Sequence, residues 1–324
     1  MKMTPANLLL FFGLIVSSLP TLPARAASLY PVVINGRWGY IKKSGDLVVN
    51  PQFERAEFFS GDRAAVRMGR WGYADPSGKI VINPQFDRTD PFSEGLAVVE
   101  LTHRHGYVNA DGKYVVNPQF DAATKFSEGR AAVRQGKAWG YIDKTGAMII
   151  NPQYQSAGVY SDGLAAVEIS RRFGYIDPNG KIVINPQFDD AMPFTDGLAA
   201  VEMDHRWGFI DKSGKLVINP QFEEVRPFVN GLAPVRLGKV WGYIDQSGHF
   251  TINPQFEDAT PFAENLAAIK MAKRWGFIDK SGKMIINPQF DGALPFSDGL
   301  ARVEVSRKIG YIDPSGKYVW NPQK

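Results

Sequence analysis

The chain has 324 residues, a formal net charge of +4 and no cysteine. The near balance of 37 basic and 33 acidic residues argues against nucleic acid as a partner, because proteins that neutralise phosphates concentrate their basic residues. The lack of cysteine excludes disulfides, thiolate chemistry and zinc sites with cysteine ligands.

Residues 1–26 differ from the rest of the chain. A short basic start precedes an apolar run at 8–16, and the sequence Ala-Arg-Ala at 24–26 has the small residues of a signal peptidase site. The run is too short for a membrane span, which needs about 20 apolar residues. The sequence therefore predicts a cleaved secretory signal over 1–26 and a β-repeat domain over 27–324, periplasmic or secreted and without a membrane span.

From about residue 28 the chain repeats itself with a period of 33 or 34 residues. A glycine marks the same point of each unit: Gly39, Gly72, Gly106, Gly140, Gly174, Gly208, Gly242, Gly276 and Gly310. In the sixth unit, residues 198–202, 207–211 and 215–219 are rich in β-formers and too short for helices. Each unit is predicted to form a three-stranded meander, and the nine units an all-β repeat domain.

The turn after the second predicted strand contains the most enzyme-like residues. In Asp177-Pro178-Asn179-Gly180 the order of residue types is typical of a type I turn followed by a glycine bulge, with the carboxylate accepting an amide of its own turn. Asn109 and Lys42 take the place of the aspartate in two units. Because an amide or a lysine replaces it, the aspartate is interpreted as a turn residue and not as a general base.

Asn-Pro-Gln follows the third predicted strand in all nine units, and the proline is expected to end that strand. An aromatic residue comes next in eight units: Phe53, Phe86, Phe120, Tyr154, Phe188, Phe222, Phe256 and Phe290. We expect this ring to pack against the following unit. Lys324 stands there in the last unit, as expected for a cap.

A second ring recurs before the next unit: Phe59, Phe92, Phe126, Tyr160, Phe194, Phe228, Phe262 and Phe296. We interpret the rings as core and not as platforms for sugar stacking. The tryptophan position before the repeated glycine supports this, since it also accepts His105, Phe173 and Ile309. The glycine itself indicates close approach of a ring or backbone.

The sequence Trp207-Gly208-Phe209-Ile210-Asp211, followed by Gly214-Lys215 and Asn219-Pro220-Gln221-Phe222, resembles the WG (KWG) repeat family of bacterial proteins. The resemblance extends from about residue 28 to the C-terminus. It implies a β-rich interaction module and supplies no catalytic residues.

Irregular residues are the candidates for chemistry, because a single site is not needed nine times. His103 and His105 form a His-x-His pair without an assignable third metal ligand, and His205 lies at the matching position three units later. Surface histidines are the favoured interpretation, with no catalytic, cofactor or metal site predicted. Trp320 replaces an aliphatic residue and is interpreted as a cap.

One polar pattern recurs in every unit: a cation in the turn before the tryptophan position. These residues are Arg37, Arg70, Arg104, Lys137, Arg172, Arg206, Lys239, Arg274 and Lys308. Stacked units would align them into an edge that binds an anionic polysaccharide or an acidic protein. The alternative is a set of solvated turn residues, partly neutralised by acids such as Asp121 and Asp189.

Nine whole three-stranded units favour an open, curved array, with a closed propeller-like ring as the alternative. The function expected is that of an exported, non-catalytic binding or scaffold protein whose partner is a protein or a cell-envelope glycan. Two alternatives remain at this point, a polymer-acting hydrolase with loop residues near His103 and His205 and a purely structural spacer.

Overall fold

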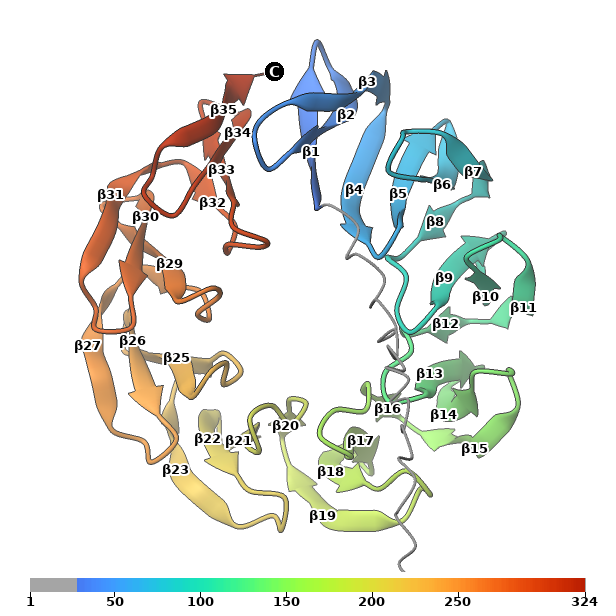
Figure 1. The fold of residues 1–324 in the computed structure, drawn as a ribbon. Helices are drawn as coiled ribbons and strands as arrows, with labels where there is room; N and C mark the ends of the chain where they lie inside the picture. The colour runs from blue at the N-terminus through green and yellow to red at the C-terminus, as the bar shows by residue number, and fades with distance from the viewer. Residues whose placement is uncertain (1–27, 324) are drawn as a thin grey trace, which may run out of the picture.

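The computed structural model describes residues 28–323, which form nine antiparallel β-sheets arranged as the blades of a ring (Figure 1). The molecule is a nine-bladed β-propeller. The signal segment expected at 1–26 and the cap at Lys324 lie outside the described residues. No helix long and apolar enough to cross a membrane occurs between residues 28 and 323.

The strands of each blade are named here, from the axis of the ring outward, the inner, second, third and outer strand. The inner strands are β4 (Arg55–Ser60), β8 (Arg88–Thr89), β12 (Ala122–Ala123), β16 (Ser156–Ala157), β20 (Asp190–Ala191), β24 (Glu224–Val225), β28 (Asp258–Ala259) and β32 (Gly292–Ala293). The second strands are β1 (Leu29–Ile34), β5 (Arg63–Met68), β9 (Leu96–Leu101), β13 (Arg130–Gln135), β17 (Ala165–Ile169), β21 (Ala199–Met203), β25 (Leu232–Leu237), β29 (Leu266–Met271) and β33 (Ala301–Val305).

The third strands are β2 (Arg37–Lys42), β6 (Arg70–Ala74), β10 (Arg104–Asn109), β14 (Ala138–Asp143), β18 (Arg172–Ile176), β22 (Arg206–Ile210), β26 (Val240–Asp245), β30 (Arg274–Asp279) and β34 (Lys308–Ile312). The outer strands are β3 (Leu47–Phe53), β7 (Ile80–Phe86), β11 (Tyr114–Phe120), β15 (Met148–Tyr154), β19 (Ile182–Phe188), β23 (Leu216–Phe222), β27 (Phe250–Phe256), β31 (Met284–Phe290) and β35 (Tyr318–Gln323). The predicted three-stranded meander is confirmed as the second, third and outer strands.

The inner strand was not predicted. It pairs with the far end of the second strand, as Asp190 with Glu202 and Ala191 with Val201. Except for β4, each inner strand has only two residues, too few to show a β-pattern in the sequence, so the backbone pairing in the folded ring reveals the strand. Eight blades have one, whereas the first blade of the described chain consists of β1, β2 and β3.

The expectation that Asn-Pro ends the outer strand is wrong. β23 continues through Asn219-Pro220 to Phe222, and the extra residues form a bulge, because Trp207 pairs with Phe222 while Phe209 pairs with Ile218. Proline is tolerated here because the outer strand is an edge and needs no further donor. The repeated glycine fits this bulge: a Cβ on Gly208 would lie 2.5 Å from the carbonyl oxygen of Ile218.

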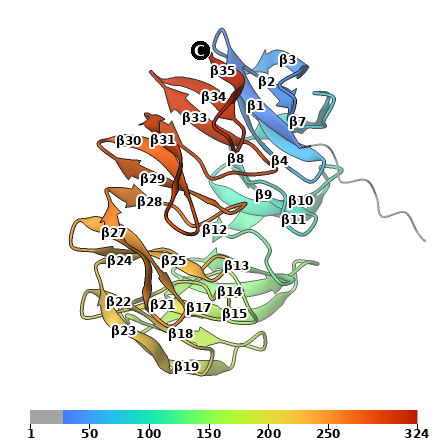
Figure 2. The same ribbon diagram turned by 60° about the vertical axis from the view of Figure 1, so that its left-hand side comes forward.

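The open array favoured from the sequence does not form; the ring, the alternative, does. β35 lies beside the first blade in both views (Figures 1 and 2). Among residues 28–323, closure uses side-chain packing and no exchanged strand: Tyr30, Val32 and Ile41 of blade 1 cluster with Leu300 and Tyr311 of blade 9. Open ends would expose these apolar faces to water, and the ring buries them.

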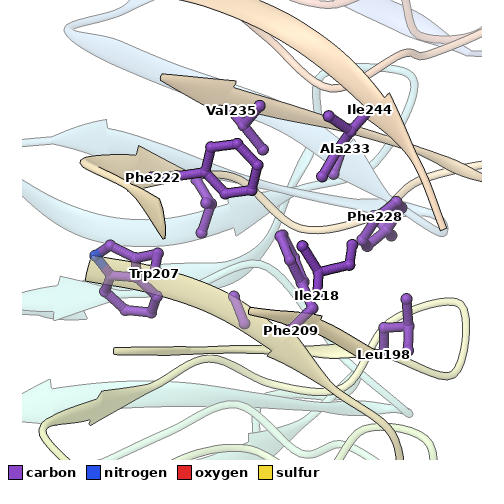
Figure 3. Packing of buried hydrophobic residues seen from close by; sticks show 11 residues of the cluster. Leu198, Trp207, Phe209, Ile218, Phe222, Phe228, Ala233, Val235 and Ile244 are labelled. Carbon is purple, nitrogen blue, oxygen red and sulfur yellow. The ribbon is translucent and has the colours of Figure 1, made fainter. Parts of the chain in front are cut away.

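The core lies between blades, as Figure 3 shows for blades 6 and 7. Phe222 of β23 is 1% exposed and packs with Phe228, Val235 and Ile244 of the next blade. The prediction that this ring packs against the following unit is therefore confirmed. Trp320, expected to be a cap, instead packs at the junction between blades 9 and 1, since the closed ring has no free end there.

Candidate functional site

The recurring cations lie on one face of the ring, called here the tip face, where the second and third strands of each blade are joined. Seven of them begin the third strand of their blade, as Arg104 and Arg206 begin β10 and β22, whereas Lys137 and Lys239 lie one residue before β14 and β26. The turns in front of them are tight. Thr102 and His103 both have positive φ, of 50° and 61°, as do Asp204 and His205 with 49° and 61°, which is the geometry of a type I′ hairpin.

The acid after each outer-strand ring lies at the same face and connects neighbouring blades. Asp189 forms an ion pair with Arg172 of blade 5, while its other oxygen accepts the backbone N–H of Asp204 in blade 6 at 2.8 Å. Glu223 does the same with Arg206 of blade 6 and the N–H of Gly238 in blade 7. The acid thus neutralises one cation and holds the strained tip of the next blade.

Five of the nine cations are paired in this way. The pairs are Arg70–Asp87, Arg104–Asp121, Arg172–Asp189, Arg206–Glu223 and Arg274–Asp291. Although burial alone would raise it, the pKa of Glu223 is lowered by the hydrogen bond from Arg206 and by backbone amides. These arginines therefore have a structural role, even though their side chains remain about half exposed.

Four cations have no ion pair with any residue in the described part of the chain: Arg37, Lys137, Lys239 and Lys308. The acid expected to neutralise Arg37 would be Glu54, but its carboxylate lies 3.7 Å from Arg67. Arg37, Lys137 and Lys239 are exposed to solvent and Lys308 is partly exposed. They are among the charges of the tip face that remain available to a partner, together with the exposed turn residues Arg171, Lys273 and Arg307.

The structure does not bring His103 and His205 together. They occupy tips of blades 3 and 6, on separate parts of the ring (Figure 1). Glu100 lies 3.7 Å from Nδ1 of His103 and 3.8 Å from Nε2 of His105. Between residues 28 and 323 no group of three or more His, Cys, Asp or Glu residues is arranged to hold a metal ion.

The opposite face, called here the turn face, carries the aspartate turns, and their predicted geometry is confirmed. Gly180 has φ +81°, and Asp177 Oδ1 accepts the N–H groups of Asn179 and Lys181 at 2.8 and 3.0 Å. In the sixth unit the Ser213 hydroxyl donates to Asp211 and lowers the pKa of that carboxyl. Asn109 accepts two equivalent amides at 3.1 and 3.0 Å, so its amide oxygen serves the turn equally well.

A second series of acids, not identified from the sequence, lies in the loops between inner and second strands at the turn face. Glu94 Oε2 accepts the N–H of Gly129 in the next blade at 2.9 Å, and Asp162 Oδ2 accepts the N–H of Gly197 at 2.9 Å. The signal in the sequence is an acid directly before a glycine, as at Glu94, Glu128, Asp162 and Asp196. These carboxylates connect successive blades and are not free to act as acids or bases.

The aromatic rings do not form sugar platforms. Phe194, Phe228 and Phe262 are 0%, 1% and 1% exposed, and Trp241 is 4% exposed. Their interpretation as core is confirmed. Most of the rings are covered by neighbouring blades, whereas Trp71, Trp139 and Trp275 remain partly exposed.

The model of the WG containing repeat matches residues 38–70, 71–101, 106–137, 139–170, 173–204, 207–241, 241–274 and 275–308. No curated protein sequence matches the chain. Among solved structures, one titled "Crystal structure of the eukaryotic initiation factor" is similar with a TM-score of 0.67 and 11% identity, over 92% of this chain and 97% of that chain. A structure of dihydro-heme d1 dehydrogenase NirN is similar with a TM-score of 0.48 and 13% identity, over 84% of this chain and 77% of that chain. The first likeness shows the propeller fold alone.

Proposed function

Since the chain belongs to the family of the WG containing repeat, we propose that it is an exported, non-catalytic binding scaffold whose partner docks on the tip face. The proposal rests on one observation: each of the nine blades carries a cation at or next to the start of its third strand on a single face, and Arg37, Lys137, Lys239 and Lys308 have no ion pair among residues 28–323. Export is proposed from the sequence of residues 1–26.

The partner proposed is an anionic surface, either an acidic cell-envelope glycan or an acidic protein. Charges on a solvated face act over about 8 to 10 Å at physiological ionic strength, so a ring of cations favours an extended partner over a small one. Binding of this kind weakens as salt rises. The burial of most rings argues against a mode in which sugars stack on the aromatic side chains of the repeat.

The hydrolase alternative receives no geometric support, because His103 and His205 lie three blades apart. Asp87 and Asp189 at these two tips accept the backbone N–H groups of Thr102 and Asp204. Hydrolysis assays on the protein and on the H103A/H205A variant still provide a direct test. An activity that disappears in this variant would replace the binding proposal.

The binding experiment compares two fourfold variants with the same change in charge. R37E/K137E/K239E/K308E reverses the cations without an ion pair, while K181E/K215E/K283E/K317E reverses four exposed lysines at the turn face. Binding to immobilised polygalacturonate and polyglutamate is measured at low and at physiological salt.

We expect the tip variant to lose at least about tenfold in affinity, about 1.4 kcal/mol, on one of the two polymers, with the turn-face variant nearly unchanged. The preferred polymer separates a glycan-like from a protein-like partner. Equal losses in both variants would mean a response to net charge and would reject the tip face as a site. If the unmodified protein binds neither polymer, the binding proposal is rejected and the purely structural spacer remains.

A further inference from the structure

The junction that closes the ring differs from the other eight. Every other junction contains the inner segment of the following blade, whereas blade 1, within residues 28–323, has β1 at its axial edge and no inner strand. The segment that would precede β1 in register falls before Ser28.

At the other eight junctions this inner segment inserts a ring beside a ring of the preceding blade. The pairs Tyr40–Phe59, Tyr73–Phe92, Tyr107–Phe126, Tyr141–Tyr160, Tyr175–Phe194, Phe209–Phe228, Tyr243–Phe262 and Phe277–Phe296 have centroids 4.8 to 5.0 Å apart. Where the first member is tyrosine, its hydroxyl donates to a carbonyl of the same inner segment, as Tyr141 does to Gly158 at 2.8 Å. Each junction is thus completed by a ring and a carbonyl from one short extended segment.

Tyr311 at the closing junction has neither the ring nor the carbonyl of an inner segment as its partner. Its ring lies 5.4 Å from Tyr30, and its hydroxyl donates to the carbonyl oxygen of Pro31, on β1 itself, at 2.8 Å. A cavity of about 380 Å³ remains beside these rings. Its lining includes Leu29, Tyr30, Phe58, Phe59, Leu294 and Tyr311, so it is largely apolar and lies where a ring is found at the other junctions.

The axial edge of β1 offers the backbone groups that an inner strand uses elsewhere. In blade 3, Leu96 exchanges two hydrogen bonds with Ser93, and Asp90 donates to the carbonyl of Val98. Leu29 and Pro31 are the equivalent residues of β1 by register. A proline at this point does not prevent pairing, because Pro234 of β25 accepts the N–H of Arg226 at 2.9 Å.

In the register of the other junctions, the sequence before Ser28 has no aromatic residue at the position of the ring. The ring stands four residues before the first residue of the second strand, as Phe92 does before Leu96, and the residue four before Leu29 is Arg25. The proposed cleavage near Ala26 would also remove this position. An aromatic side chain in this register would come from another molecule.

We propose that the closing junction is a peptide-binding site, in which an extended segment of a partner protein pairs with β1 and places an aromatic side chain in the cavity beside Tyr311. The mode is strand addition: main-chain hydrogen bonds give affinity and the cavity selects the side chain. On binding, the Tyr311 hydroxyl transfers from Pro31 to a carbonyl of the peptide, as at the other tyrosine junctions. This site is separate from the tip-face cations.

The chain provides its own probe for this site. A fluorescent peptide with the sequence DGALPFSDG, which copies residues 291–299, has the ring and carbonyls of an inner segment, and the same peptide with alanine for phenylalanine is its control. Both are titrated against the full-length protein, and N-acetylphenylalaninamide serves as a competitor without an extended backbone.

The matched protein variants are L294W and L237W. Leu294 lines the cavity and is 38% exposed, whereas Leu237 is 44% exposed and lies on β25 away from it. Because both side chains are largely exposed, either tryptophan is tolerated, and circular dichroism verifies the fold.

We expect the phenylalanine peptide to bind with a Kd below about 1 mM, the alanine peptide and L294W to weaken binding at least about tenfold, and L237W to change it little. Hydrogen exchange should show new protection in β1 on binding. No binding, equal binding of the alanine peptide or undiminished binding to L294W would overturn the proposal. So would equally tight binding of N-acetylphenylalaninamide, or protection of β1 before any peptide is added, which would place residues 1–27 at this edge.

Discussion

Phe222→Ala tests whether stability comes from packing between blades. The side chain belongs to blade 6, is 1% exposed and packs on Phe228, Val235 and Ile244 of blade 7. A buried aromatic residue removes about 150 to 200 Å² from water, which at about 25 cal/mol per Å² is about 4–5 kcal/mol. This agrees with the destabilisation of about 3–5 kcal/mol that is typical when a buried phenylalanine is replaced by alanine.

The free energy of unfolding is measured by urea titration with tryptophan fluorescence, together with hydrogen exchange resolved by blade. Val217→Ala is the control, because Val217 lies on the same strand but is 41% exposed, and a change within about 0.5 kcal/mol is expected. Phe222→Ala should accelerate exchange in blades 6 and 7 together. The argument fails if the two variants are equally stable, or if exchange changes in blade 6 alone.

Gly208→Ala should destabilise the fold by about 1–3 kcal/mol, because the added Cβ would lie 2.5 Å from the Ile218 carbonyl oxygen. Gly158→Ala should not destabilise it, because the nearest contact of its Cβ is at 3.5 Å. Equal thermal midpoints for the two variants would contradict this. Tyr141→Phe should cost about 1 kcal/mol in a urea titration, since it leaves the Gly158 carbonyl without its donor; a loss no larger than that of an exposed substitution would show that the bond is not needed. Stability should fall as pH decreases below about 4. Hydroxyl hydrogen bonds lower the pKa values of six turn aspartates from 3.8: Asp75, Asp143, Asp211, Asp245, Asp279 and Asp313. Folding therefore favours their charged forms, and this stability is lost as they are protonated. Replacing these six aspartates by asparagine should flatten that acid limb in thermal melts, and an unchanged pH profile would refute the assignment. Stability should also fall above about pH 10, because burial raises the pKa of Tyr141 above its usual 10.0 and folding there favours the neutral phenol; an alkaline limb that is unchanged in Tyr141→Phe would argue against it.

Local features of this protein are encoded in short stretches of the sequence. The Asp177–Gly180 turn was predictable because its residue types select one backbone geometry, and the structure has that geometry. The core role of Phe222 and Phe194 was predictable because a ring at a fixed phase in every unit, next to positions that vary, indicates packing and not a single site. The need for glycine at position 208 was likewise visible as close approach, although the sequence did not tell that the neighbour is the bulge at Asn219-Pro220.

The candidate sites depend on which units meet, and this is not written in any one unit. The pairing of Arg206 with Glu223 was foreseen only as proximity of acids and cations. That Lys137 and Lys239 form no ion pair within residues 28–323 required the coordinates. The separation of His103 from His205 likewise follows from the ring.

The repeat by itself determined an all-β chain of nine units that bury their rings against one another. Whether the ends of such a series meet depends on the small twist and tilt between neighbouring blades, which accumulate over nine junctions and have no local signal in the sequence. Tertiary structure alone therefore decided that the ring closes, that Tyr30 meets Tyr311 across 281 positions of the chain, and that a cavity remains where they meet.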